Sequence, residues 1–189
     1  QFFFDTDHLE GESGSQKNLL VAADVPALNV ADPNIPTSLE MAKAILGVVG
    51  HFFKIKDDQG KPINRQAANF QVQVPINLWA IAVQAVQSNL LNSGTGTVDN
   101  PLGVISRNSS LRFDVVPNPE LTIGTEFYTF RTDGRAKPFI LQNEEGVKVD
   151  AIAEGSELEF HNDVHQYGIK ALRNVGYGYW QHAIKATLS

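Results

Sequence analysis

A short stretch near the carboxyl end of the sequence carries residue types that could perform metal chemistry. In EFHNDVH, residues 159–165, a carboxylate or an imidazole stands at every second position. Alternate residues of a strand share one face, so Glu159 and the side chains that follow it at this spacing would line up. Two imidazoles flanked by carboxylates could bind zinc or iron and activate a water molecule. One hypothesis is therefore a metal-dependent enzyme that uses His161, Asp163 and His165.

The same spacing is also typical of the polar, solvent-facing side of a strand whose other face carries Phe160 and Val164. The further ligands of such a site would have to be His8, His51 or His182, which are candidates only because they are the remaining histidines. The sequence has no phosphate-binding Gly-rich loop, no Gly-x-Ser-x-Gly elbow and no cysteine. We therefore expect no catalytic, cofactor-binding or metal site, and we expect that the protein is not an enzyme.

Composition narrows the possible partners. The chain has 189 residues, of which 42% are hydrophobic, and a formal net charge of −6. This is enough for one domain with a substantial core. The lysines and arginines are scattered, which argues against tight binding of nucleic acid through phosphate contacts. The best apolar run, LWAIAV, ends at Gln84 and is far shorter than the ~20 residues of a membrane helix, so we expect no membrane partner.

The clearest local signal is a helix start. Thr37-Ser38-Leu39-Glu40 fits a capping box, and apolar residues recur behind it at helical spacing, which predicts a helix over residues 38–53. An Asp-Asp-Gln-Gly turn within residues 54–63 predicts a hairpin. Gly47 lies near the apolar stripe of the helix, where it either weakens the helix or permits close approach of a neighbouring element.

The middle of the chain reads as strand, helix and then mostly strands. Alternation predicts a strand over residues 70–74, and Asn77 is a plausible N-cap for a helix over residues 77–91. Residues 92–110 read as a long irregular loop. Short strands are expected after it, with a long one running through residues 159–172. This order predicts an α+β fold with antiparallel sheet.

The sequence ends on an unusual mixture of aromatic residues and glycines. A Tyr-Gly pair at residues 167–168 and Arg173-Asn174 precede GYGYWQ, residues 176–181. Glycines between aromatic residues allow large rings to pack where the backbone approaches another element. Tyrosine and tryptophan supply wide contact area with polar tips, as interface anchors do, although a closing strand with an aromatic core is the alternative interpretation.

This closing segment resembles that of the Mu-like phage major head subunit family, in which the same elements occur in this order. FFFDTDH at residues 2–8 with the later Asn18, the turn at residues 58–63, and VQVPINLWAIA at residues 72–82 are similar to further segments of that family. The resemblance thus covers most of the chain. The residues to which it assigns a structural or assembly role are Tyr167, Gly168, Arg173, Asn174, Gly176, Tyr177, Gly178, Trp180 and Gln181.

The resemblance implies the Hong Kong-type fold of tailed-phage capsids. Such a subunit has a peripheral domain, with a long helix and long antiparallel strands, and an axial α/β domain. Residues 1–69 would supply part of the peripheral domain, residues 70–155 mainly the axial domain, and residues 156–189 the strands that return to the periphery. Because the chain begins with Gln1 and not with methionine, the resemblance also implies an N-terminal arm and an extended loop that are missing from this sequence.

The implied function is structural. A major capsid protein of a Mu-like phage or prophage self-assembles into the hexamers and pentamers of an icosahedral shell that encloses DNA. Its partners would be further copies of itself, other head proteins, and packaged DNA held by loose non-specific contact. It would be made in the cytoplasm of the bacterial host and end in the virion.

Overall fold

A computed structural model describes residues 3–93, 96–152, 155 and 157–189, without the side chains of Leu158 and Glu159. The chain divides into two compact units. We call Gln1–Pro138 with Tyr179–Ser189 the main unit, and Phe139–Gly178 the hairpin unit. None of the helices in these described ranges is long and apolar enough to cross a membrane.

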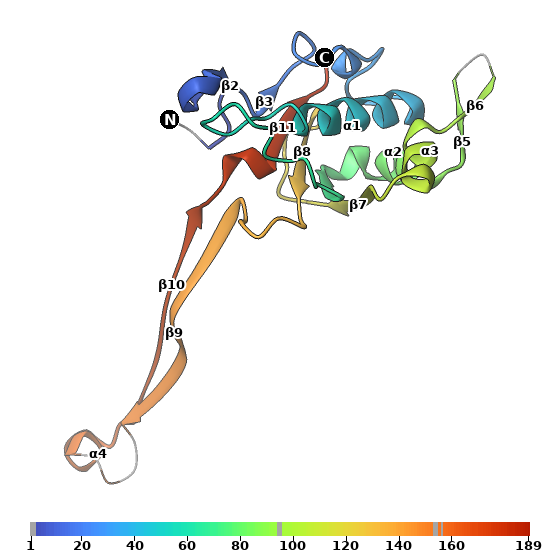
Figure 1. Cartoon of the computed structure of the whole chain (residues 1–189). Helices are drawn as coiled ribbons and strands as arrows, with labels where there is room; N and C mark the ends of the chain where they lie inside the picture. Colours follow the sequence, from blue (N-terminus) through green and yellow to red (C-terminus); the bar gives the residue numbers. More distant parts are fainter. Residues whose placement is uncertain (1–2, 94–95, 153–154, 156) are drawn as a thin grey trace. The chain divides into compact units, whose positions relative to one another are not determined.

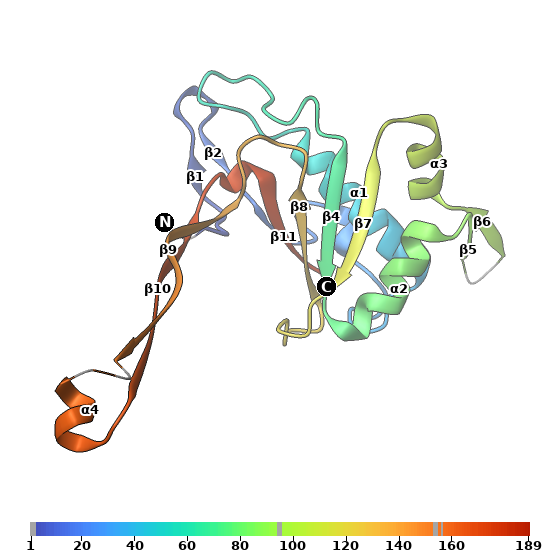
Figure 2. The ribbon, with the colours of Figure 1, turned by 90° about the horizontal axis from the view of Figure 1, so that it is seen from below.

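The main unit is built on a mixed five-stranded sheet in the order β3-β11-β8-β4-β7 (Figures 1 and 2). Strand β4 pairs in parallel with β7 and antiparallel with β8, and β11 joins antiparallel β8 to parallel β3. The five strands are β3 (Leu19–Leu20), β4 (Asn69–Val74), β7 (Arg112–Pro117), β8 (Glu126–Arg131) and β11 (Ala183–Thr187).

Helix α1 (Ser38–Phe52) covers one face of this sheet, and its start is the predicted capping box. The Thr37 side chain accepts a hydrogen bond from the Glu40 amide, and the Glu40 carboxylate accepts one from the Thr37 amide at 2.8 Å. The helix buries a wide apolar stripe against the alternate residues of β4, with the Phe52 and Phe70 rings 5.3 Å apart. At Gly47 an added Cβ would lie 2.6 Å from a methyl group of Val25, so close approach is the reason for this glycine.

The connection between β4 and β7 differs from prediction. Helix α2 (Ile76–Gln87) begins directly after Pro75 and ends before the predicted limit of residue 91. Asn77 is not its N-cap, because its amide instead donates to the Asn34 and Gly124 carbonyls. Parallel strands need such a crossover, and α2 packs beside both of them.

The predicted irregular loop over residues 92–110 is also wrong, because most of the described residues in this range belong to regular elements. Strand β5 (Leu90–Asn92) pairs with β6 (Thr97–Asp99), and helix α3 (Pro101–Asn108) follows. Asn100 caps α3 by accepting from the Leu102 amide at 3.0 Å, and its own amide donates to the Ala85 carbonyl at 2.7 Å. Asn100 followed by proline at the first helical position is a sequence signal for the start of a helix.

The amino-terminal segment wraps the edge of the sheet with short elements. Strand β1 (His8–Leu9) pairs with β2 (Ser15–Gln16) around the 3-10 turn η1 (Gly11–Ser13), and η2 (Pro26–Leu28) precedes α1. The predicted hairpin over residues 54–63 is reduced to a single bridge between Lys56 and Pro62.

The hairpin unit consists of two long antiparallel strands, β9 (Phe139–Ile152) and β10 (Gln166–Tyr177), with helix α4 (Glu157–Asn162) in their connection (Figure 1). The predicted strand over residues 159–172 is therefore wrong at its start, since residues 159–162 are helical and β10 begins only at Gln166. Leucine and glutamate at the start of this helix are good helix formers, and helix propensity here outweighs the alternation. The architecture as a whole is mixed α+β, as predicted, but the sheet of the main unit is not antiparallel, because β4 pairs in parallel with β7 and β11 with β3.

Candidate assembly site

The closing aromatic motif is divided between the two units. Tyr167, Gly168, Arg173, Asn174, Gly176 and Tyr177 all lie on β10, where the backbone is paired with β9 but the side chains are exposed. Trp180 and Gln181 lie in the 3-10 turn η3 (Trp180–His182) of the main unit. Gly178 stands between them, at the boundary of the hairpin unit. The motif therefore contains two environments with different physical roles.

Trp180 is held against the amino-terminal segment. Its ring stacks on the ring of His8, with centroids 4.1 Å apart and an angle of 6° between the planes. Its Nε1 donates to Glu10 Oε1 at 2.9 Å, and the Gln181 side-chain amide donates to the same oxygen at 2.9 Å. One carboxylate thus fixes two neighbouring residues of the motif, and hydrogen bonds to a charged acceptor are stronger than neutral ones.

Asn18 connects this site to the first residues of the chain. It is fully buried, and its Oδ1 lies 2.9 Å from His8 Nε2 and accepts from the Asp5 amide at the same distance. Its Nδ2 donates to the Phe3 carbonyl at 2.9 Å. The FFFDTDH segment and Asn18, which were singled out only by resemblance, are therefore brought together with Trp180.

Gln181 is anchored on its other side by a buried asparagine. Asn64 donates to the Gln181 carbonyl at 2.9 Å and to the Phe52 carbonyl at 3.1 Å. Its own oxygen accepts from Arg131, whose Nε also donates to Asp133 at 2.7 Å. Burial acts to raise the pKa of Asp133, but the hydrogen bonds from Arg131 and from the Ala68 amide and the positive charge of Arg131 together outweigh it, so the pKa lies below its ordinary value.

His182 completes the turn. It is buried, its Nδ1 lies 2.9 Å from the Ala136 carbonyl oxygen, and its ring stacks near Tyr179. Burial lowers the pKa of His182, only partly offset by the contact with this carbonyl. Burial therefore disfavours the protonated form of this imidazole. Glu10 and Asn64 were not predicted as parts of the site, since they contact the motif from far along the chain, and Arg131 reaches it through Asn64. His182, which directly follows the motif, was not predicted as part of it either.

The hairpin unit has two chemically different faces. Residues paired across an antiparallel ladder share a face, and the pairs Val175 with Leu141 and Ile169 with Val149 place apolar side chains together. The register shifts by two residues between Lys170 and Arg173. Within this shift Glu145 pairs with Leu172 and so belongs to the opposite face, and the alternation resumes at the pair of Arg173 and Asn143. We define the apolar face as the odd-numbered residues Phe139, Leu141, Asn143, Val147, Val149, Ala151, Tyr167, Ile169, Ala171, Arg173, Val175 and Tyr177.

The apolar face is open to solvent. Val175 is 67% exposed and Ile169 76%, and every large hydrophobic side chain of the face is exposed. The rings of Phe139 and Tyr177 contact each other at 6.1 Å, yet Tyr177 remains 74% exposed. No element of the described chain approaches within 4 Å of the position that a Cβ would take at Gly176, so the expected close backbone approach is wrong there.

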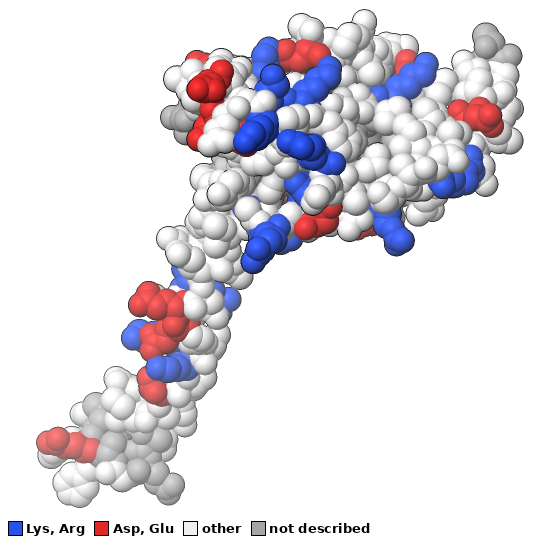
Figure 3. Space-filling view, viewed as in Figure 1, with Lys and Arg blue, Asp and Glu red and all other residues white. Residues whose placement is uncertain are grey.

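The opposite face carries Ile140, Ile152 and Leu172, and it also holds an ion-paired cluster of charged side chains. Glu145 binds Lys148 at 2.7 Å and Lys170 at 2.8 Å, so one carboxylate bridges both strands. Figure 3 shows acidic and basic side chains gathered in one zone of this unit. The lysines lower the pKa of Glu145 from its ordinary value.

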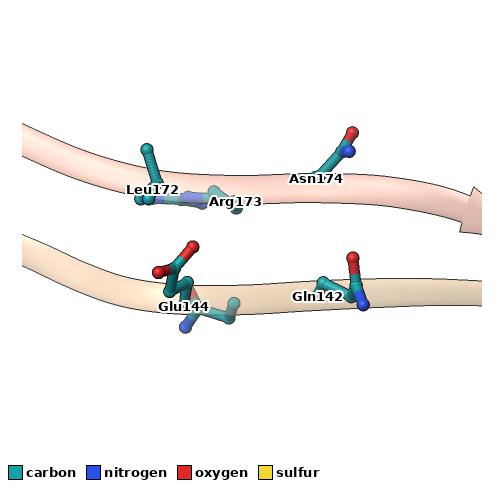
Figure 4. A pocket seen from close by; sticks show the side chains of 6 residues that line it. Gln142, Glu144, Leu172, Arg173 and Asn174 are labelled. Carbon is teal, nitrogen blue, oxygen red and sulfur yellow. The ribbon is translucent and has the colours of Figure 1, made fainter.

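An open hollow of the hairpin unit lies in the middle of the ribbon. Gln142 and Asn174 are paired across the strands at this level, as are Asn143 and Arg173 (Figure 4). Its lining is mainly polar amide groups and has no histidine, so it offers no metal or catalytic constellation.

The strand face on which the metal hypothesis depended is not formed. His161 belongs to helix α4, whereas Asp163 has a φ of 51° and His165 precedes β10, so these residues do not share the face of a strand. The side chain of Glu159 lies outside the described part. Among the residues that are described, no group of three or more metal-binding side chains is close enough to hold an ion.

Comparison with family models supports the resemblance over the carboxyl-terminal part of the chain. Residues 109–189 match the family model of the Mu-like prophage major head subunit gpT. The resemblance is therefore confirmed over the segment that contains β7 to β11 and the whole closing motif. A comparison with curated proteins finds no match. The match to this family indicates a structural role in the phage head.

Proposed function

We propose that this protein is a major capsid subunit that self-assembles into the hexamers and pentamers of an icosahedral shell enclosing DNA. The observation that carries the proposal is the match to the head-subunit family over residues 109–189. This segment includes the complete hairpin unit, whose exposed apolar face is suited to contact other molecules.

The Hong Kong-type capsid fold is part of this proposal. The assignment of residues 1–69 and 156–189 to a peripheral domain and of residues 70–155 to an axial domain is part of it as well. The chain's own contacts divide it at other places, before Phe139 and after Gly178.

The remaining partners follow from the role. Other head proteins would contact the shell, and packaged DNA would be held loosely, which agrees with a net charge of −6. The subunit would be made in the cytoplasm of the bacterial host. Stability of the shell would come from many modest contacts between copies, so no catalytic residue is required.

Expression of the complete gene, followed by negative-stain electron microscopy and sedimentation over a range of concentrations, tests the proposal. We expect shells, rings or tubes with sixfold units. Uniform small particles at every concentration would refute self-assembly.

A further inference from the structure

The sheet of the main unit has one long open edge. Strand β7 is the last strand of the order β3-β11-β8-β4-β7, and within the described part of the chain it pairs only with β4 (Figure 2). The strand at the other edge, β3, has two residues. An edge strand presents a row of main-chain donors and acceptors that can pair with another strand. Strand β7 is therefore the place where a further strand can extend this sheet.

The main-chain groups that point away from the sheet follow from the pairing of β7 with β4. The Arg112 amide donates to the Ala68 carbonyl of the segment that leads into β4, at 2.7 Å. Successive residues of a strand direct their main-chain groups to opposite sides in the plane of the sheet, so Phe113 and Val115 direct theirs outward. In the ranges that the structure describes, no hydrogen bond is made to these outward groups.

There is room beside the first residues of this edge. A hollow of about 530 Å³ lies there, lined by Ser106, Ser109, Ser110, Leu111, Arg112 and Phe113. Helix α3 ends at Asn108 and does not fill this space. A strand that pairs with β7 would enter it.

The side chains of β7 carry opposite charges two positions apart. Arg112 and Asp114 are exposed and share one face of the sheet, and neither forms an ion pair within the described part of the chain. Phe113 and Val115, on the other face, pack against the core. Two charges of the same sign would repel a second copy of this edge. One residue of each sign instead makes the edge complementary to itself when two copies run antiparallel.

The charges select one register for such a pair, in which Phe113 of one copy lies opposite Phe113 of the other. Arg112 of each copy then faces Asp114 of the other, at the positions without main-chain hydrogen bonds, where side chains lie closest. The outward amides of Phe113 and Val115 meet outward carbonyls of the second strand. With Arg112 or Asp114 at the centre, two like charges would face each other. With Val115 at the centre, Phe113 would face Pro117, which has no amide hydrogen to donate.

We propose that β7 pairs antiparallel with β7 of a second copy of this chain, in the register centred on Phe113, so that two sheets become one continuous sheet. Both copies contribute the same surface, so the contact closes as a dimer around a two-fold axis. It joins about five residues of each copy over about 17 Å, which buries less than the roughly 1,200 Å² of a stable binary interface. The dimer should therefore dissociate on dilution. The contact does not depend on assembly into a shell.

Disulfide formation tests the register without background, because the chain contains no cysteine. Arg112→Cys and Asp114→Cys, made in the complete gene, each replace an exposed side chain, so both variants should fold, as circular dichroism can verify. When the two variants are mixed and oxidised, we expect a disulfide-linked dimer, since the two positions face each other with Cα atoms about 4.5 Å apart. Each variant alone should give less than about a tenth of this dimer, because identical positions are diagonal neighbours about 7–8 Å apart, beyond the reach of a disulfide.

Exchange of the charges tests the contact independently. Arg112→Asp and Asp114→Arg each turn two attractive pairs into two repulsive ones, so each should weaken dimerisation by at least about tenfold in sedimentation of the unassembled fraction. An equimolar mixture of these variants restores both pairs, as does the double variant that carries both substitutions, so both should dimerise like the wild type. Arg65→Asp makes the same charge change at an exposed residue outside the sheet and should leave dimerisation unchanged.

Three results would overturn the proposal. The first is a wild-type monomer at every concentration, which would leave the edge to a strand of a different protein. The second is an efficient disulfide of Asp114→Cys alone, which would indicate another register. The third is equal weakening by Arg65→Asp and Arg112→Asp.

Electron microscopy of the same samples separates this contact from the capsid function. Shells without the disulfide between residues 112 and 114 would refute the contact and leave the capsid function standing. The disulfide and the charge rescue without any shell would support the contact and refute the capsid function.

Discussion

Two aromatic residues of the closing motif should respond in opposite ways to truncation. Trp180 is packed in the main unit, whereas Tyr177, three positions earlier, is 74% exposed on the hairpin. Trp180→Ala should destabilise the folded chain. Tyr177→Ala should leave the free energy of unfolding nearly unchanged and weaken assembly instead.

The magnitude follows from the contacts that Trp180 loses. The stack on His8 contributes about 0.5–1.5 kcal/mol, and the hydrogen bond to the Glu10 carboxylate about 1.5–3 kcal/mol. Complete burial of a tryptophan would make the loss about 3–5 kcal/mol, but this ring is only partly buried. We therefore expect about 3 kcal/mol for Trp180→Ala. For Tyr177→Ala we expect a change within about 0.5 kcal/mol.

Urea unfolding followed by far-ultraviolet circular dichroism measures this difference. With a slope of about 2 kcal/mol per molar, Trp180→Ala should lower the unfolding midpoint by about 1.5 M. Trp180→Phe retains a ring to stack on His8 but has no donor for Glu10, so its midpoint should fall between those of the wild type and the alanine variant. Equal midpoints for Trp180→Ala and Tyr177→Ala would refute the division of the motif into a packed part and an exposed part.

Three further predictions concern the main unit. Gly47→Ala should destabilise it by about 1–3 kcal/mol through overpacking. Gly50→Ala should stabilise it by up to about 1 kcal/mol, because a Cβ there meets nothing within 4 Å. Thermal unfolding of the two variants checks that their stabilities change in opposite directions. Asn64→Ala should cost about 2–3 kcal/mol, because buried carbonyls lose their donor, and a urea midpoint equal to the wild type would contradict the network. Burial lowers the pKa of both His51 and His182, so the unfolded state binds protons first as the pH falls below about 6.5. Stability should therefore decrease from pH 7.5 to pH 5.5, and the double variant with glutamine at both positions should show a flatter profile in urea titrations.

Local sequence signals predicted the elements whose cause is local. The capping box at Thr37 and the apolar stripe behind it fixed helix α1 to within one residue, because both signals act within a few turns of the same helix. Alternation likewise predicted β4. Signals failed where two local preferences compete: residues 159–162 alternate like a strand but form a helix, and residues 92–110 are rich in turn formers but contain a hairpin and α3.

The candidate site was predicted only in part. The closing motif was found from its residues and its resemblance to the head-subunit family, and the family match confirms that resemblance. Which members of the motif are packed and which are exposed could not be predicted, because Trp180 and Tyr177 are chemically similar and lie three residues apart.

The sequence by itself determined an α+β chain with a capped helix, no cysteine chemistry and a family signature at its carboxyl end. Only the tertiary structure decided what that signature does. Trp180 is fixed by Glu10, 170 residues earlier in the chain, and Gln181 by Asn64. Tyr177, in contrast, lies on a ribbon that ends before the packed turn begins. Contacts over such separations depend on how the sheet closes, and no pattern within a short window of sequence encodes that closure.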